Sequence, residues 1–394
     1  MPGTRSGEGA GSSSLLSPRR IGDLNRSRVL RALSDHGPLS RADLAKEAGV
    51  TRATMGTIVQ TLIDSGILEE HEPVNLGAIG KPARPVWFAP GAGLAIAASV
   101  TMHGVDACLV DAGGTVRDHH HEALKDRDNT TTVARAVADA VSRVHVRTAK
   151  PVGVGVAVPG VCDTARGEVL GSGQVPGARG RTIVERVMAR TSLAVHIDND
   201  SRTHALAEKW FGAGRGLDTY AALQTGDGLG AGIVLNGEIV RSRNGIAGEV
   251  GHTAVVVDGD RCTCGLRGCW ETIATLRWLR REAKARGLRG ASVMTCARLV
   301  ALAAESSDAE ALLDTYAANL AIGIANLNQT LSLEVFILHG DVLGGGEPFR
   351  TRVERYARQR SLSRLSIQYS TLGDDVALLG AGALVLAETF RMVA

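Results

Sequence analysis

The sequence predicts an α/β protein that carries a small helical module at its N-terminus. From residue 94 onward, short apolar strands alternate with amphipathic helices, an order that is typical of α/β folds. Before that point, three helical patterns lead into a hairpin punctuated by glycine and proline. The chain has 394 residues, enough for two or three compact units. We expect a flexible tail over residues 1–20, one module over residues 21–90 and a larger α/β module over residues 91–394.

The composition excludes several broad classes of protein. Hydrophobic residues make up 44% and charged residues 22%, as in globular chains and unlike disordered or fibrous ones. The apolar run at residues 376–387 is shorter than the ~20 residues that span a bilayer, so it predicts a buried helix. Residues 1–20 lack the apolar core of a signal peptide. These features predict neither secretion nor a membrane partner.

Charge and cysteine are unevenly distributed along the chain. The net charge of +3 is too close to neutral to identify a nucleic-acid-binding protein by itself. Residues 1–60, however, hold nine basic residues against five acidic ones, so the positive excess lies at the N-terminus. Three of the six cysteines crowd into residues 262–269, which favours a metal site over a disulfide framework.

Capping residues delimit the three N-terminal helices. The first pattern covers residues 24–35 and ends before a Gly-Pro pair. Ser40 begins a Ser-x-x-Asp cap for a short second helix, which Gly49 ends. Thr51 caps the third helix, whose apolar residues recur at helical spacing. Two helices joined by a short turn that contains glycine form a helix-turn-helix pattern.

A basic hairpin follows the third helix. Two short strands, at residues 67–71 and 86–88, flank a Gly/Pro-rich connection with two cationic side chains. Such a wing can lay its cations along phosphates or in a minor groove, and the start of a recognition helix reaches base edges. We therefore predict binding of double-stranded DNA, and the residues that we expect to contact it are Ser40, Arg41, Thr51, Arg52, Thr54, Thr57, Lys81 and Arg84.

An alternative to DNA binding stays open, because a plain three-helix bundle without a ligand has the same helical periodicity. Gly56 and the acidic residues near the wing also allow other interpretations. Gly56 inside the third helix costs ~1 kcal/mol relative to alanine. It makes room either for DNA or for the packing of another helix. The acidic side chains that surround the wing should face away from phosphate, and they are Asp64, Glu69, Glu70 and Glu72.

The larger module alternates strands and helices. Strands are expected at residues 94–100, 105–111, 152–158, 193–197, 220–223 and 233–235. Helices are expected at residues 130–147, 201–211, 272–286, 294–304 and 308–330. A glycine-rich run at residues 226–232 either cradles a phosphate or forms a hairpin turn. The triplet His119-His120-His121 follows a strand and is expected to be a solvated edge.

One histidine and three cysteines form a metal-binding pattern. His252 is followed, within eighteen residues, by Cys262, Cys264 and Cys269. Thiolate and imidazole ligands suit a closed tetrahedral Zn²⁺ site. Because four protein ligands leave no open position, we expect the zinc to be structural. The alternative is a loop of reduced cysteines beside an incidental histidine.

This combination of segments resembles the ROK family, which unites sugar-responsive bacterial repressors with sugar kinases. The most specific segments are NGIAGEVGH at residues 244–252 and CTCGLRGCWE at residues 262–271. VPGV at residues 158–161 and IDND at residues 197–200 add to the resemblance. Residues 21–90 resemble the winged helix of ROK repressors, and residues 91–394 resemble the ROK domain. The resemblance implies a two-lobed, hexokinase/actin-like domain with a sugar cleft between its lobes.

Matched position by position, the resemblance assigns roles to individual residues. Asp200 matches the base that removes a hydroxyl proton in the family's kinases. The implied zinc ligands are His252, Cys262, Cys264 and Cys269. The residues implied to line the effector site are Gln174, Asn199, Asp200, Glu249, His252 and Glu271.

The chain departs from the family's kinases at both phosphate loops. Where the kinases carry Asp-x-Gly-Gly-Thr, this chain has Ser-Val-Thr-Met-His at residues 99–103. Asp227 replaces a threonine of the second loop and would face a triphosphate with negative charge. In the cleft, Gln174 and Arg202 stand for asparagines and Ala178 for a tryptophan. The changes in the two phosphate loops weaken ATP binding. The departures in the cleft leave open a phosphorylated or larger effector, or none.

The resemblance therefore implies a cytoplasmic, sugar-responsive transcriptional regulator, and a repressor in particular. Such a protein would bind operator DNA as a homodimer or homotetramer, with an affinity that a sugar or sugar phosphate modulates. Two alternatives remain. One is an ATP-dependent sugar kinase with Asp200 as its base, and the other is a DNA-binding protein whose cleft binds no effector.

Overall fold

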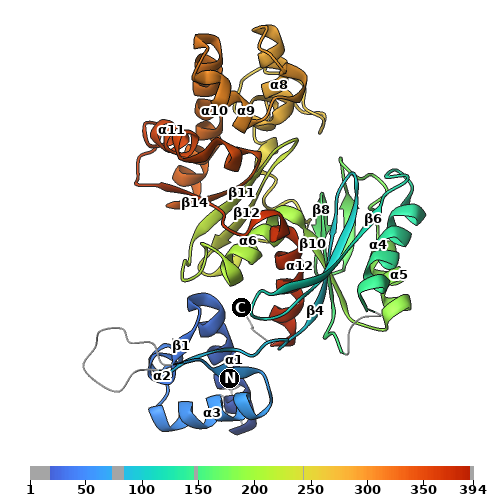
Figure 1. Ribbon diagram of the computed structural model, residues 1–394, viewed down its shortest axis with the longest axis vertical. Helices are drawn as coiled ribbons and strands as arrows, with labels where there is room; N and C mark the ends of the chain where they lie inside the picture. The colour runs from blue at the N-terminus through green and yellow to red at the C-terminus, as the bar shows by residue number, and fades with distance from the viewer. Residues whose placement is uncertain (1–17, 73–83, 146–149, 243, 391–394) are drawn as a thin grey trace, which may run out of the picture.

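The computed structural model describes residues 18–72, 84–145, 150–242 and 244–390, with side chains from Gly22 onward. A small N-terminal module lies at the bottom of Figure 1, and two α/β lobes lie above it. The prediction of an α/β fold that begins with a winged helix is confirmed. None of the described helices combines the length and the apolar character that crossing a bilayer requires.

The N-terminal module is a helical bundle closed by a small antiparallel sheet of order β1-β3-β2. Its first helix begins at Pro18, inside the segment expected to be a tail, and Ser40 and Thr51 cap the next two helices as predicted. The connection at residues 73–83, with Lys81, lies outside the described residues. The elements are α1 (Pro18–His36), β1 (Leu39–Ser40), α2 (Arg41–Ala48), α3 (Arg52–Asp64), β2 (Leu68–Glu70) and β3 (Pro85–Phe88).

The first lobe is a five-stranded mixed sheet of order β10-β7-β4-β5-β6. Helices α4 and α5 cover its outer face, and the C-terminal helix α12 (Val376–Thr389) packs on its inner face against β4 and β7. The elements are β4 (Ala95–Val100), β5 (Gly104–Val110), β6 (Val116–Ala123), α4 (Thr130–His145), β7 (Val154–Val158), β8 (Val161–Asp163), β9 (Glu168–Gly171), α5 (Thr182–Thr191) and β10 (Val195–Asn199).

The histidine triplet lies inside β6, so the expectation that it follows a strand is wrong. β6 is the edge strand of the sheet, and its side chains are partly or fully exposed. His119 and His121 pair with the carboxylates of Asp375 and Asp106, at 3.1 and 2.8 Å. A polar edge strand has no apolar alternation, so residues 116–123 carry no strand signal. The expectation of a solvated edge is confirmed.

The second lobe is a five-stranded sheet of order β13-β12-β11-β14-β15, with a helical extension at the top of Figure 1. Helix α6 packs on one face of this sheet, against β11 and β12. The strands are β11 (Tyr220–Thr225), β12 (Leu229–Leu235), β13 (Glu238–Ile239), β14 (Val335–Gly340) and β15 (Ser366–Tyr369). The helices are α6 (Asp200–Phe211), α7 (Glu271–Ala274), α8 (Leu276–Ala285), α9 (Cys296–Ala303), α10 (Ser307–Leu331) and α11 (Gly346–Arg358).

The helix expected at residues 272–286 is two helices, α7 and α8, because the backbone of Thr275 is extended. The amide of Leu276 donates to the carbonyl oxygen of Gly226, 2.8 Å away, instead of to an oxygen within the helix. A contact with a residue fifty positions earlier has no local signal. The strand expected at residues 233–235 is likewise longer, since β12 begins at Leu229.

The glycine-rich run forms a hairpin, the second of the two readings left open. β11 and β12 pair antiparallel across Gly226-Asp227-Gly228, and the rest of the run belongs to β12. A Cβ on Gly230 would lie 2.4 Å from the hydroxyl of Ser201, and one on Gly232 would lie 2.3 Å from its carbonyl oxygen. These glycines therefore allow α6 to lie directly on β12.

Candidate functional site

The start of α6 lies where the two lobes meet. The strand β10 of the first lobe ends at Asn199, and α6 begins at Asp200 and crosses to the second lobe. The Asn199 side chain caps the helix, since its Oδ1 accepts the amide of Arg202 at 3.1 Å and its Nδ2 donates to the carbonyl oxygen of Gly160 at 2.8 Å. The capping fixes the backbone at the start of α6, where Asp200 is the first residue.

Arg202 is buried and forms hydrogen bonds to residues of both lobes. Its guanidinium donates to Asp198 Oδ1 at 2.6 Å and to the carbonyl oxygen of Cys162 at 3.0 Å, both in the first lobe. It also donates to the carbonyl oxygens of Gly245 and Ala247, at 2.9 and 3.1 Å, in the loop that leads to Glu249. All its donors are used within the chain. Arg202 is therefore not a free anion-binding group.

Arg241 completes the buried ion pair. Its guanidinium donates to Asp198 Oδ2 at 3.0 Å, and Arg202 takes the other carboxylate oxygen. Asp198 is fully buried, so both charges are needed to compensate for its desolvation. Sequence reasoning noted Arg202 only as a departure from the family and missed this pairing with Asp198 and Arg241. Asp198 lies in the strand β10 and Arg202 in the helix α6, so their spacing of four residues is not that of a helical pair and gave no local signal.

Two carboxylates lie near His252, and a third, that of Asp200, lies near one of them. His252 Nε2 lies 3.7 Å from Glu249 Oε2, and its Nδ1 lies 3.8 Å from Glu271 Oε1. Burial raises the pKa of Asp200 to about 6, and the charge of the neighbouring Glu249 contributes to the rise. Burial also raises the pKa of Glu249. Of the predicted effector residues, the structure thus brings Asp200, Glu249, His252 and Glu271 together, with Asn199 beside them.

Gln174 lies apart from that group, on the loop between β9 and α5. Its side chain is exposed and borders the glycine hairpin, since a Cβ on Gly228 would lie 3.1 Å from its Nε2. The first lobe therefore reaches the second lobe here as well. The predicted role of Gln174 in effector binding stays a prediction.

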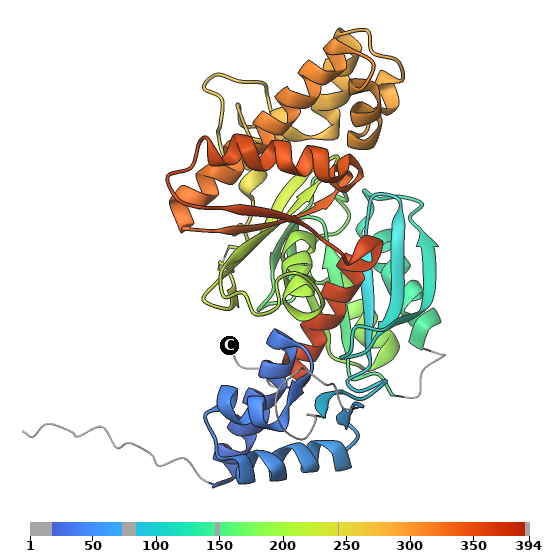
Figure 2. The ribbon, with the colours of Figure 1, turned by 60° about the vertical axis from the view of Figure 1, so that its left-hand side comes forward.

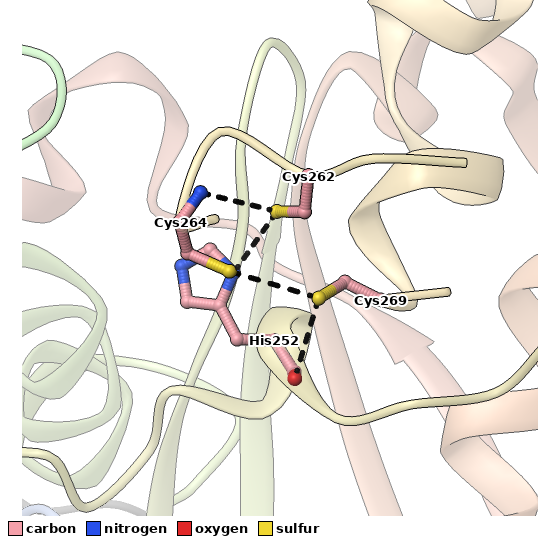
Figure 3. A group of neighbouring side chains, drawn as sticks. All are labelled: His252, Cys262, Cys264 and Cys269. Carbon is pink, nitrogen blue, oxygen red and sulfur yellow. Dashed lines mark hydrogen bonds between the residues drawn. The ribbon is translucent and has the colours of Figure 1, made fainter. Parts of the chain in front are cut away.

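His252, Cys262, Cys264 and Cys269 converge on one point (Figure 3). Their four potential ligand atoms all lie within 4.8 Å of one another. Cys264 Sγ lies 3.8 Å from Cys269 Sγ, and Cys262 Sγ lies 3.5 Å from His252 Nδ1. The loop returns on itself through Gly268, whose φ of 71° and close contact with Val256 exclude a side chain.

These distances fit a tetrahedral metal ion. Two sulfur ligands about 2.3 Å from a zinc ion lie about 3.8 Å apart, and a sulfur and an imidazole nitrogen lie about 3.6 Å apart. Without a cation, burial and the hydrogen bond to Glu271 raise the pKa of the Cys262 thiol to about 12. A bound cation would favour the thiolate instead. The donor set and its geometry thus fit a divalent metal.

The two stretches that correspond to phosphate loops are closed by internal contacts. At the turn between β4 and β5, Thr101 Oγ1 accepts the amides of His103 and Gly104, each at 3.2 Å. At the glycine hairpin, Asp227 pairs with Arg280 of α8 at 3.1 Å. The amides of His103 and Gly104 and the guanidinium of Arg280 are thus engaged within the protein.

The recognition helix α3 presents one exposed face. Arg52, Thr54, Thr57 and Gln60 are exposed on it, and Met55, Val59 and Leu62 are buried against the bundle. Thr51 Oγ1 accepts the amide of Thr54 at 3.2 Å, so the helix N-terminus is capped and open to solvent. A Cβ on Gly56 would meet nothing within 4 Å. Among the residues that the structure describes, no helix packs against Gly56, so helix packing does not explain this glycine there.

Arg41 is held by contacts within the module. It donates to Glu70 at 2.9 Å, to Gln60 at 3.1 Å and to the carbonyl oxygen of Gly56 at 3.3 Å. Arg84 is exposed and lies 4.0 Å from Glu70. Glu70, expected to face away from phosphate, therefore holds two of the cations expected to face it. Ser40 caps α2 and is partly buried.

Two protein families match different parts of the chain. The profile of the ROK family matches residues 96–388, and that of the MarR family matches residues 23–75. A glucokinase of Halalkalibacterium halodurans is 34% identical over 274 residues, which cover 65% of this chain and 82% of the glucokinase. A xylose repressor of Caldicellulosiruptor bescii is 28% identical over 389 residues, which cover 93% of this chain and 96% of the repressor.

Among solved structures, a ROK family transcriptional regulator described as a homolog of the Escherichia coli MLC protein has a similar fold. The TM-score is 0.77 at 24% identity, over 94% of this chain and 98% of that chain. The repressor matches therefore include the winged helix, whereas the glucokinase match covers a smaller share of the chain.

Replacing Asp200 with asparagine should stabilise the protein at alkaline pH only. A carboxyl whose pKa is higher in the folded than in the unfolded chain favours folding at low pH, and that contribution is lost as the pH rises through about 6. Asp200→Asn should raise the free energy of unfolding by roughly 2 kcal/mol at pH 8 and leave it unchanged near pH 4. Urea unfolding at both pH values measures this, with Asp374→Asn, at an exposed position, as control. An equal effect at both pH values would contradict the buried-carboxyl account.

Proposed function

The chain belongs to the ROK family, and on that basis we propose that it is a sugar-responsive transcriptional repressor. The observation that carries the proposal is the joining of a winged helix to a sugar-kinase-like domain in one chain, matched along 93% of its length by a xylose repressor. The winged helix binds operator DNA, and the cleft binds a sugar or sugar phosphate that weakens this binding.

The DNA contact is made by the exposed face of α3 and by the wing. Arg52, Thr54 and Thr57 reach base edges, and the open N-terminus of α3 with Thr51 meets a phosphate. Arg41 and Arg84 lie beside Glu70 and would contact phosphates at the margin of this face, with Ser40 next to Arg41. The contact expected of Lys81, which lies outside the described residues, stays a prediction. One winged helix has a small footprint, so the protein binds an inverted repeat as a homodimer or homotetramer.

The effector contact is made at the start of α6 and on the metal-bearing loops. Asp200, Glu249 and Glu271 can accept hydrogen bonds from neighbouring hydroxyls of a sugar, with His252 and Asn199 beside them, and Gln174 would reach a larger ligand from its place beside the glycine hairpin. The carboxylates disfavour a phosphate in their midst, and Arg202 is unavailable to pair with one. The site therefore suits an uncharged sugar better than a sugar phosphate.

The metal is a structural zinc ion held by His252, Cys262, Cys264 and Cys269. The spacing of the sulfur and nitrogen atoms supports this assignment, as does the closed four-ligand set. When bound, the ion fixes the loop that carries Glu271 and orients His252, whose other ring nitrogen faces Glu249. Sugar binding at these side chains thus depends on the metal.

Two observations argue against the kinase alternative. Thr101 occupies the amides of the first turn, and the Asp227–Arg280 pair covers the glycine hairpin. Phosphoryl transfer depends on amides and cations that are free to position a triphosphate. Asp200 is therefore a binding group and not a catalytic base.

The proposed function predicts a ligand-sensitive complex with duplex DNA. A duplex selected by the full chain from random sequence should bind with an affinity that falls steeply with salt. D-xylose, D-glucose, N-acetyl-D-glucosamine and D-glucose 6-phosphate are the probes, and at least one should weaken binding about tenfold or more. Fluorescence anisotropy measures both effects. Absence of any preferred duplex would contradict the proposal, and steady ATP turnover with one of these sugars would favour the kinase instead.

Gly56→Ala should change stability and DNA binding in opposite directions. The methyl group meets no protein atom, so the higher helix propensity of alanine should raise the free energy of unfolding by ~1 kcal/mol. The same methyl group fills the space nearest the DNA and should weaken binding to the selected duplex about tenfold. Gly22→Ala in α1, another open helical position, is the matched control and should affect stability alone. Undiminished DNA affinity in Gly56→Ala would place this face away from DNA.

Cys264→Ser should remove the metal. Elemental analysis should find about one zinc per wild-type chain and almost none in the variant, because three remaining ligands bind zinc more weakly. The sugar response should fall with it. Cys108→Ala, which changes a buried cysteine outside the cluster, should keep its zinc. A full zinc content in Cys264→Ser would refute the ligand set.

A further inference from the structure

The N-terminal module shares one hydrophobic core with the ends of two helices of the larger domain. Figures 1 and 2 both show α12, in red, ending against the blue module. Side chains from α1, α2, α3 and β3 form a single buried cluster with the C-terminal parts of α6 and α12. The members from α6 and α12, with the residue that follows α12, are Leu206, Trp210, Ala383, Leu384, Leu386 and Phe390.

Phe88 lies at the centre of this junction. It is the last residue of β3 and is buried. Its ring stacks on Phe390 with a centroid distance of 5.5 Å and an interplanar angle of 14°. It also stacks on Trp210 of α6, at 6.3 Å and 22°. One ring of the DNA-binding module thus contacts one ring from each of the two helices.

Polar contacts fix the same junction from the side of α6. Lys209 pairs with Asp35 of α1 at 3.3 Å, and both side chains are largely buried. Arg215 donates to the carbonyl oxygen of Trp210 at 2.7 Å, and its guanidinium lies 5.3 Å from the centroid of the Trp87 ring. The N-terminal module is therefore attached to the end of α6 by polar contacts as well as by the hydrophobic core.

The two helices that meet Phe88 belong to different lobes. α12 packs on β4 and β7 of the first lobe, where a Cβ on Gly155 would lie 1.8 Å from the carbonyl oxygen of Ala381. α6 packs on β11 and β12 of the second lobe. The helices cross at backbone distance, since a Cβ on Gly380 would lie 1.9 Å from the carbonyl oxygen of Thr203. At such a crossing the two helices can rotate relative to each other but cannot easily move apart.

The other end of α6 lies in the candidate effector site. Asp200 is its first residue, and Arg202 ties its first turn to loops of both lobes. Asp200 and Trp210 are ten residues apart in this helix, so about 15 Å of rigid backbone separates them along its axis. A rotation of the lobes about this crossing moves Trp210 relative to Phe390.

We propose that Phe88 is the positioning residue through which the state of the cleft reaches the DNA-binding module. Its ring stacks on one aromatic ring from each lobe. A change in the angle between α6 and α12 therefore changes the position of the Phe88 ring. Because Phe88 ends the wing strand β3, the wing and α3 move with it. This inference rests on the proposed function and identifies how the effector site of that function is read.

Phe390→Leu tests the proposal, because it removes one ring without altering the DNA-binding module or the effector site. The variant should bind the selected duplex within about threefold of wild type. The change in DNA affinity caused by D-xylose, D-glucose, N-acetyl-D-glucosamine or D-glucose 6-phosphate should shrink from about tenfold to less than about twofold. Calorimetry should find the affinity for the sugar itself unchanged. Trp210→Leu, which removes the other ring, should behave in the same way.

Phe349→Leu is the matched control. Phe349 is a fully buried aromatic residue of the second lobe that stacks on Tyr316, far from the junction. Its replacement should lower stability as the other variants do and leave the sugar response intact. If both ring variants respond to sugar as wild type does, the proposal is overturned and the proposed function stands. If wild type responds to none of the four probes, the proposed function fails and this proposal fails with it.

Hydrogen exchange in the wild-type chain provides a measurement that needs no variant to fold. A sugar that weakens DNA binding should change the exchange of amides in residues 84–90 and leave α4, on the outer face of the first lobe, unchanged. A sugar that weakens DNA binding without any change in residues 84–90 would overturn the proposal.

Discussion

The buried ion pair between Asp198 and Arg202 is the interaction on which the cleft depends. It joins the last strand of the first lobe to the first turn of α6, and the remaining donors of Arg202 hold backbone oxygens of both lobes. Removing one partner of such a pair leaves a buried charge and costs about 3–5 kcal/mol. The start of α6, with Asp200, and the loop that leads to Glu249 are therefore held in place by contacts within the protein.

A single helix serves both functions that we propose for the chain. The first turn of α6 carries Asp200 into the cleft, and its last turn carries Lys209 and Trp210 into the DNA-binding module. Rigid coupling over this distance requires only that the helix keep its length and that its two ends remain anchored. The Cys/His cluster adds a second fixed point, because the loop that it closes carries Glu271.

The parts that sequence predicted correctly are those with local signals. Ser40 and Thr51 cap their helices through bonds to residues three positions away, and the spacing of His252 and the cysteines reports their convergence. The features that were missed depend on distant partners. Thr275 breaks a helix because Leu276 bonds to Gly226, and Gly230 and Gly232 are strand residues because α6 lies on them. Arg202 was visible as an unexpected residue, but its partners at Cys162, Gly245 and Ala247 come together only in the fold.

In the proposed repressor the cleft and the winged helix are energetically coupled. Thermodynamic linkage between sugar binding and DNA binding measures this coupling. The affinity of the full chain for whichever of D-xylose, D-glucose, N-acetyl-D-glucosamine or D-glucose 6-phosphate binds it should be measured by calorimetry with and without a saturating selected duplex. If the two sites are coupled, the duplex should weaken sugar binding by the same factor by which the sugar weakens DNA binding. An equal affinity for the sugar in both titrations would contradict this coupling.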